Sequence, residues 1–282
     1  MNQTYVYRKH LRSPFKYLLL MEVIVFVGVV IMLSGLIITD EQKMNGNSLI
    51  IGGIILLVVF LFISLEMGLC YLLLMKRFKS ISITLTEDAI VYTNSKARII
   101  IPYLDIEKLE FPSIKYTGGW LKIIYKGGNI RLTVVLEHIG DFINELKEKM
   151  NEREMAHVYN EKKMFSFFKT AVFSDESWER LYQNYKFMLV TYYLCMILTI
   201  VILRFNGNSS DNRFYIFGSL LGPLLGYLIS EIIIGIQVKK RVVREELRLL
   251  PRNPEFEQKV FKILLIGFSL GYLLILLVIR ML

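Results

Sequence analysis

Five long apolar runs constrain the fold of this chain more than any other feature of its sequence. They cover residues 17–38, 49–75, 187–203, 214–238 and 263–279. A helix crosses the hydrocarbon core of a bilayer with about 20 apolar residues, and about 17 to 25 are tolerated. Hydrophobic residues make up 54% of the chain, and ordinary soluble domains have roughly 45–50%. The sequence therefore predicts an α-helical integral membrane protein with five transmembrane helices.

The basic residues are divided unevenly between the two sides of these runs. The N-terminal residues 1–16 and the loop 239–262 are rich in lysine and arginine, whereas Lys43 alone is basic between the first two runs. Cytoplasmic segments of membrane proteins carry such an excess. We therefore expect a multi-pass plasma-membrane protein with a cytoplasmic N-terminus and its C-terminus outside. The net charge of +9 then suits anionic lipid headgroups, and no basic–aromatic pattern indicates nucleic acid as a partner.

The segment 80–151 has a different hydrophobic pattern, because its apolar residues alternate with polar ones. Alternation of this kind predicts strands, here at 81–85, 90–93, 98–101, 105–111, 120–125 and 130–135. Gly127-Gly128-Asn129 is typical of a tight hairpin turn. A helix up to Met150 is expected to follow, since apolar residues recur on one face, at Ile139, Phe142, Ile143, Leu146 and Met150. We expect a small cytoplasmic β-barrel or bent sheet that one helix closes.

Three stretches of this domain carry a resemblance to a known family. They are residues 83–88 (Ile-Thr-Leu-Thr-Glu-Asp), residues 101–106 (Ile-Pro-Tyr-Leu-Asp-Ile) and the closing helix 136–150. The segment resembles the bacterial pleckstrin-homology-like domains that are carried on membrane hairpins, including the YcxB-like kind. The resemblance implies binding and assembly rather than chemistry. The lysine–arginine cluster that binds phosphoinositides in eukaryotic relatives is absent, because the turn reads Thr86-Glu87-Asp88.

The segment 152–186, which precedes the third run, combines aromatic and basic residues. Such a composition is typical of a helix that lies in the membrane interface. The candidate interface residues are Phe165, Phe168, Lys169, Trp178 and Tyr182. The same aromatic residues could instead pack the β-domain against the ends of the spans, and the sequence leaves both interpretations open.

Glycines recur within the fourth and fifth runs. Gly218, Gly222 and Gly226 are four residues apart, as are Gly267 and Gly271. Small residues at this spacing let helix backbones approach closely, so the sequence predicts a contact between the fourth and fifth transmembrane helices. Pro223 is expected to kink the fourth helix, because proline cannot donate the helical hydrogen bond.

Three carboxylates lie inside the apolar runs: Glu22, Glu66 and Glu231. At about 1.5 Å per residue they lie roughly 9–15 Å from the cytoplasmic ends of their helices. A charge inside the bilayer is expensive, so such residues are functional candidates by default. They form a polar site if they converge. If they lie at the headgroup level, they only anchor the helices at the interface.

The candidate chemistry is limited. No catalytic motif is present, Cys70 and Cys195 lie inside apolar runs, and the three histidines are scattered. We therefore expect no enzyme activity, no metal site and no cofactor. The expected function is that of a membrane-anchored interaction or regulatory protein, whose β-domain binds a protein partner or the membrane surface. The alternative is a small oligomeric transporter, or an ion or proton pathway, that uses the three glutamates; a homo-oligomer is expected in that case.

Overall fold

The computed structural model describes residues 3–39, 46–76, 78–114, 116–205, 212–243 and 247–281. The chain forms two compact units. The first, here called the β-unit, consists of Met1–Lys16, Tyr71–Arg180 and Gly235–Arg252. The second, the helical unit, consists of Tyr17–Cys70, Leu181–Ile234 and Asn253–Leu282. The β-unit is thus built from three segments that are far apart in the sequence.

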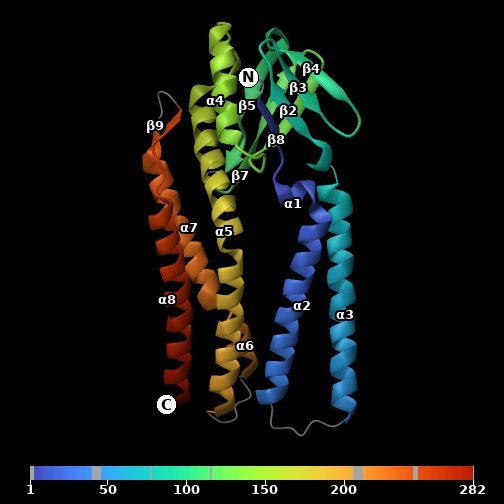
Figure 1. Ribbon diagram of the computed structural model, residues 1–282, viewed down its shortest axis with the longest axis vertical. Helices are drawn as coiled ribbons and strands as arrows, with labels where there is room; N and C mark the ends of the chain where they lie inside the picture. The colour runs from blue at the N-terminus through green and yellow to red at the C-terminus, as the bar shows by residue number, and fades with distance from the viewer. Residues whose placement is uncertain are drawn as a thin grey trace. The chain divides into compact units, whose positions relative to one another are not determined.

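One sheet of the β-unit has four antiparallel strands in chain order (Figure 1). They are β1 (Gln3–Val6), β2 (Ser82–Leu85), β3 (Ala89–Thr93) and β4 (Arg98–Pro102). Tyr5 lies opposite Ile83, which in turn lies opposite Tyr92, and all three side chains are buried. β2 to β4 match the predicted strands closely. β1 was not predicted, and it makes the N-terminal segment a structural part of the domain.

The second sheet is arranged around a long central strand. β7 (Gly118–Tyr125) pairs antiparallel with β5 (Ile106–Glu110), β6 (Ser113–Ile114) and β8 (Gly128–Thr133). The predicted hairpin turn joins β7 to β8, with Tyr125 opposite Gly128. Gly128 has a backbone φ of 141°. Residues with a side chain rarely adopt this angle, whereas glycine adopts it readily.

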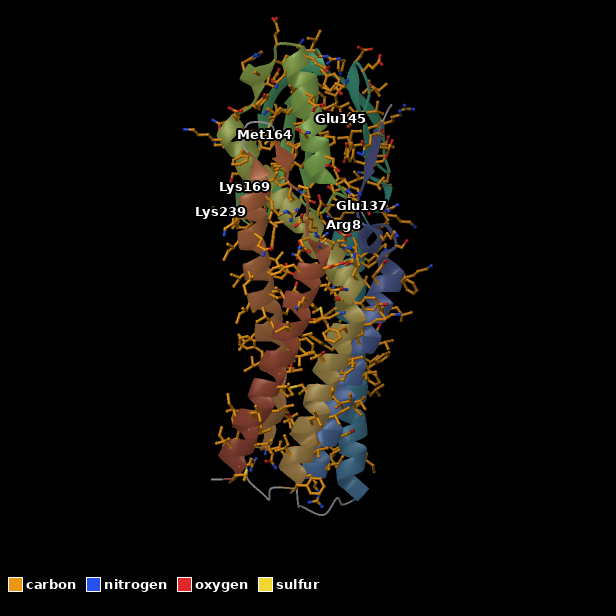
Figure 2. All side chains as sticks on the ribbon, turned by 60° about the vertical axis from the view of Figure 1, so that its left-hand side comes forward. Arg8, Glu137, Glu145, Met164, Lys169 and Lys239 are labelled. Atoms are coloured by element: carbon orange, nitrogen blue, oxygen red, sulfur yellow. The ribbon has the colours of Figure 1, made fainter. Side chains whose placement is uncertain are left out.

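Two helices enclose the core of the β-unit. The first is α4 (Ile139–Glu152), and its predicted apolar face is fully buried. The second is the beginning of α5 (Glu161–Phe205), where Met164 (labelled in Figure 2), Phe167 and Phe168 are buried in the same core. Val238 and Val242, from the third segment of the unit, join them. Part of the aromatic segment 152–186 therefore packs in the core of the β-unit, and its position at the membrane interface stays a prediction.

Within the described residues, five helices are long and apolar enough to cross a membrane. They are α2 (Pro14–Thr39), α3 (Gly46–Cys70, with the apolar run reaching Leu73), α5, α6 with α7 (Asn212–Gly218 and Leu221–Arg241), and α8 (Pro254–Met281). The number agrees with the prediction. The boundaries differ most for the third helix, which is the end of the 45-residue α5, and for α8, which begins nine residues before position 263. The short elements of the described residues include α1 (Lys9–Arg12), β9 (Val242–Val243) and β10 (Arg248–Leu249).

The predicted kink at Pro223 is a break between α6 and α7. The helix is interrupted at Ser219 and Leu220. The break falls four residues before the proline, because the proline ring clashes with the carbonyl at that position and has no N–H to donate to it.

Candidate functional site

The outer face of the second sheet carries an exposed apolar pair. Strand alternation buries Leu121 and Ile123 and therefore turns Trp120, Lys122 and Ile124 outward. Ile114 lies opposite Gly118 on the same face. The exposed fractions are 72% for Ile114 and 41% for Trp120. Contiguous exposed apolar side chains with polar residues around them are a feature of interaction sites.

Charged residues surround this apolar pair. The register places Arg131 opposite Lys122, and Lys108 opposite Ile124. Glu110 lies between two lysines, with carboxylate oxygens 2.8 Å from Lys108 Nζ and 3.7 Å from Lys122 Nζ. The hydrogen bond from Lys108 lowers the pKa of Glu110. Arg131 is exposed and makes no ion pair within the described part of the chain. We call Lys108, Glu110, Ile114, Trp120, Lys122, Ile124 and Arg131 the Trp120 face.

Three ion pairs connect α5 to the N-terminal segment and to the third segment of the β-unit. Arg8 from the N-terminal segment binds Asp175, and Arg252 from the third segment binds Glu179. Arg241 binds Glu176 through both guanidinium NH₂ groups, at 2.7 and 3.1 Å. Arg8 is buried and lies near Glu137 (Figure 2). The backbone N–H of Glu137 donates a hydrogen bond to the backbone carbonyl of Val6. These pairs hold the unit together.

Aromatic and imidazole groups of the β-unit have shifted pKa values that burial explains. Burial raises the pKa of Tyr103 to about 12. Burial also raises the pKa of Tyr5, whose hydroxyl donates a 2.8 Å hydrogen bond to Glu145. Burial, and secondarily the charge of Arg8, lowers the pKa of His10 to about 4. His10 stacks on Trp178 with ring centroids 4.4 Å apart.

The candidate interface residues are largely accounted for by packing in the β-unit. Phe168 is buried, and Phe165 is half-buried beneath Lys169, whose Nζ lies 4.4 Å from the ring centroid. Trp178 is the stacking partner of His10. Tyr182 is half-buried and belongs to the helical unit. The start of α5 thus contributes apolar side chains to the core of the β-unit, and a role of these residues at the membrane interface stays a prediction.

The three span glutamates have different surroundings in the helical unit. Glu22 on α2 accepts a hydrogen bond from Ser64 on α3. Glu66 is exposed, since residues two apart on a helix point about 200° from each other and Ser64 faces α2. Glu231 on α7 is half-buried. Among the described residues, no group of three or more His, Cys, Asp or Glu could hold a metal ion. An ion or proton pathway through these residues stays a prediction.

The glycines of the fourth transmembrane helix make the predicted contact with the fifth. A Cβ at Gly226 would lie 2.6 Å from the Leu264 carbonyl oxygen, and one at Gly222 would lie 3.0 Å from that of Phe268. Gly218 faces the Tyr272 ring. The partner glycines on α8 were predicted wrongly, because a Cβ at Gly267 or Gly271 would have nothing within 4 Å. Leu265, Ser269 and Tyr272 line the contact instead.

The Trp120 face was not singled out from the sequence, although a signal for it exists. The predicted strand 120–125 alternates, so burying Leu121 and Ile123 necessarily exposes the tryptophan that begins the strand. Arg131 gives no comparable signal, because its place opposite Lys122 depends on the register of β7 and β8.

Comparison with known proteins supplies no further identification: no protein-family model matches the chain, and no curated protein or solved structure is similar to it.

Proposed function

We propose that the chain is a membrane-anchored interaction protein whose β-unit is a pleckstrin-homology-like domain that binds a partner protein at the Trp120 face. The observation that carries the proposal is the exposed pair Ile114 and Trp120, set among Lys108, Lys122 and Arg131. Tryptophan and arginine dominate the binding energy of protein interfaces when an apolar anchor is surrounded by polar groups. The two antiparallel sheets and the closing helix α4 support the domain assignment.

The composition of the β-unit supports its placement on one side of the membrane. Its three segments are the N-terminal residues, the insert between the second and third spans, and the loop before the fifth. Segments that share one core must lie on the same side of the bilayer. These are also the segments with the excess of basic residues, so the positive-inside rule assigns them to the cytoplasm.

The charges of the Trp120 face favour a protein over a lipid surface as the partner. Binding to an anionic membrane gains about 1 kcal/mol for each basic residue near the surface. On the Trp120 face, Glu110 forms ion pairs with both Lys108 and Lys122. Arg131 is the basic residue of this face that has no ion-pair partner among the described residues. A partner segment with an apolar side chain for Trp120 and a carboxylate for Arg131 fits this arrangement.

Site-specific photo-crosslinking in the source cells tests the proposal with the full-length chain. A photoreactive residue at position 114 is expected to give a protein adduct of discrete mass. The matched control is position 84 on the outer face of the first sheet, where no adduct is expected. Trp120→Ala should weaken the interaction by about 2 kcal/mol or more, or about thirtyfold. A lipid adduct in place of a protein adduct would assign the face to the membrane surface, and equal adducts at both positions would contradict the proposal.

A further inference from the structure

The hairpin that joins β6 to β7 contains a tyrosine in an unusual backbone conformation. Tyr116 has a φ of 60°. It is the third residue of a turn in which the Thr117 N–H donates a 3.0 Å hydrogen bond to the Ile114 carbonyl. Turns with a positive φ at this position normally have glycine or asparagine there. A bulky residue keeps such a conformation where surrounding contacts hold it, and such residues concentrate at ligand clamps and switch regions.

The helix α5 supplies contacts that hold Tyr116. The hydroxyl of the buried Thr170 donates a 3.2 Å hydrogen bond to the Ser166 carbonyl, and its oxygen accepts a 3.3 Å hydrogen bond from the Tyr116 N–H. Three residues further along α5, the Phe173 ring packs edge-on against the Tyr116 ring, with centroids 5.6 Å apart. The same hairpin carries the exposed apolar pair of the Trp120 face. The position of this face therefore depends on α5.

Phe173 also contacts α7 within the β-unit. A Cβ at Gly235 would lie 3.2 Å from Phe173 Cε2, and the three atoms nearest to it all belong to this ring. The bidentate pair between Arg241 and Glu176 joins the same two helices. The ring can approach the α7 backbone closely because Gly235 has no side chain. Phe173 therefore lies between Tyr116 and α7.

We propose that Tyr116 and Phe173 are positioning residues that couple the Trp120 face to α7, so that a displacement of α7 against α5 changes the affinity of this face for its partner. This inference rests on the proposed function of the Trp120 face. A shift of Gly235 towards α5 must be taken up by the Phe173 ring, because close-packed protein interiors contain few voids. A displaced ring moves Tyr116, and Tyr116 moves the hairpin that carries the apolar pair.

Electron paramagnetic resonance of the full-length chain tests the coupling without any partner. Both native cysteines are replaced by serine, and a nitroxide is attached to a single cysteine at position 114. Gly235→Ala should change the mobility of this nitroxide, because the new Cβ meets the Phe173 ring. The matched control is Gly271→Ala, which should leave the mobility unchanged, because a Cβ there has nothing within 4 Å.

A double-mutant cycle separates this coupling from a general loosening of the β-unit. Tyr116→Gly removes the ring and accommodates the positive φ, so in this background Gly235→Ala should no longer affect the nitroxide at position 114. Independent sites would give additive effects instead. A nitroxide at position 84, on the first sheet, should respond to neither substitution. Unchanged mobility at position 114 in Gly235→Ala, additive effects in the cycle, or an equal response at position 84 would overturn the coupling.

Photo-crosslinking at position 114 then tests the effect on the partner. Gly235→Ala should weaken binding about fivefold, the lower end of typical couplings between two sites, and Gly271→Ala should not weaken it. An adduct yield that Gly235→Ala leaves unchanged would overturn the proposed regulation. If the parent chain forms no protein adduct at all, the proposed function is wrong, whereas the mobility measurements still decide whether the hairpin is coupled to α7.

Discussion

Arg241 binds Glu176 through both guanidinium NH₂ groups, at 2.7 and 3.1 Å, and thereby ties the last turn of α7 to α5 within the β-unit. The two side chains are only 15% and 10% exposed. Arg8 also binds Asp175, and Arg252 binds Glu179. The three ion pairs thus join the N-terminal segment and the segment before α8 to the same helix, α5. The ionic row on α5 therefore makes the N-terminal segment and the loop before α8 structural parts of the β-unit.

Removal of one charge from this pair is expected to destabilise the β-unit. Glu176→Gln should lower the free energy of unfolding by about 3 kcal/mol, because it removes the negative charge that both Arg241 NH₂ groups bind at a poorly exposed site. Both tryptophans of the chain, Trp120 and Trp178, belong to the β-unit, so urea unfolding in detergent can be followed by their fluorescence. The control is Glu152→Gln. The Glu152 side chain is 60% exposed, with a carboxylate oxygen 3.8 Å from Lys149 Nζ and 3.5 Å from Arg153 Nη1, so the substitution should change stability by less than about 0.5 kcal/mol. Equal effects of the two substitutions would show that the buried pair has no special role.

The glycines of α7 and α8 should respond oppositely to the same substitution. Gly226→Ala places a Cβ 2.6 Å from a backbone oxygen of α8, so the two helices must separate. Gly271→Ala meets nothing within 4 Å, and it should raise helix stability by up to about 1 kcal/mol, since alanine loses less backbone entropy than glycine. The thermal midpoint of the chain in detergent micelles is the measurement. A lower midpoint for Gly271→Ala than for Gly226→Ala would contradict the assigned contact.

The segment 80–151 should not fold when it is excised. It lacks β1, and it lacks the part of α5 that covers the core, including Met164, Phe167 and Phe168. A fragment in which flexible linkers join residues 1–12, 78–180 and 235–252 restores both and keeps the third segment, whose Val238 and Val242 lie in the same core. Circular dichroism should show cooperative melting for the joined fragment only. Cooperative melting of the short fragment would mean that β1 and α5 are dispensable.

Stability should depend on the protonation of His10. Its pKa is about 4 in the folded chain, against an ordinary value of 6.5, so the unfolded chain binds this proton more tightly. The stability that neutral His10 contributes is complete above pH 6.5 and is lost as the pH falls from 6.5 towards 4. The urea midpoint of the parent chain should therefore fall more steeply across this range than that of His10→Gln. Identical pH profiles would show that His10 is not buried as described.

Local periodicity explains why much of this fold could be predicted. The five spans, the strands β2 to β5, β7 and β8, and the buried face of α4 each repeat an apolar pattern over many residues. β1 was not predicted because it is only four residues long and carries little periodicity of its own. It is defined by its pairing with β2, which lies far along the chain and begins at Ser82. Arg8, Arg241 and Arg252 were visible only as members of basic runs. Their partners on α5 depend on the tertiary fold.

The glycines and glutamates show a second limit of the sequence. Gly222 and Gly267 occur in the same small-residue spacing, yet only Gly222 faces another helix. Spacing shows which residues share a face, but the rotation of the helix decides what that face meets. For the same reason, the depth of Glu66 could be estimated from the sequence, whereas its exposure could not.

Cysteine labelling in sealed vesicles tests most directly the claim that three separate segments form one unit on the cytoplasmic side. Single cysteines at Gln3, Ile114 and Leu250 sample the three segments, all at exposed positions; Ser209, outside the described residues, samples the opposite side. A membrane-impermeant maleimide should label the first three only from the cytoplasmic side and Ser209 only from the outside. Labelling of any one of the three from the side opposite to the other two would contradict the account, because no single core can form from segments that the bilayer separates.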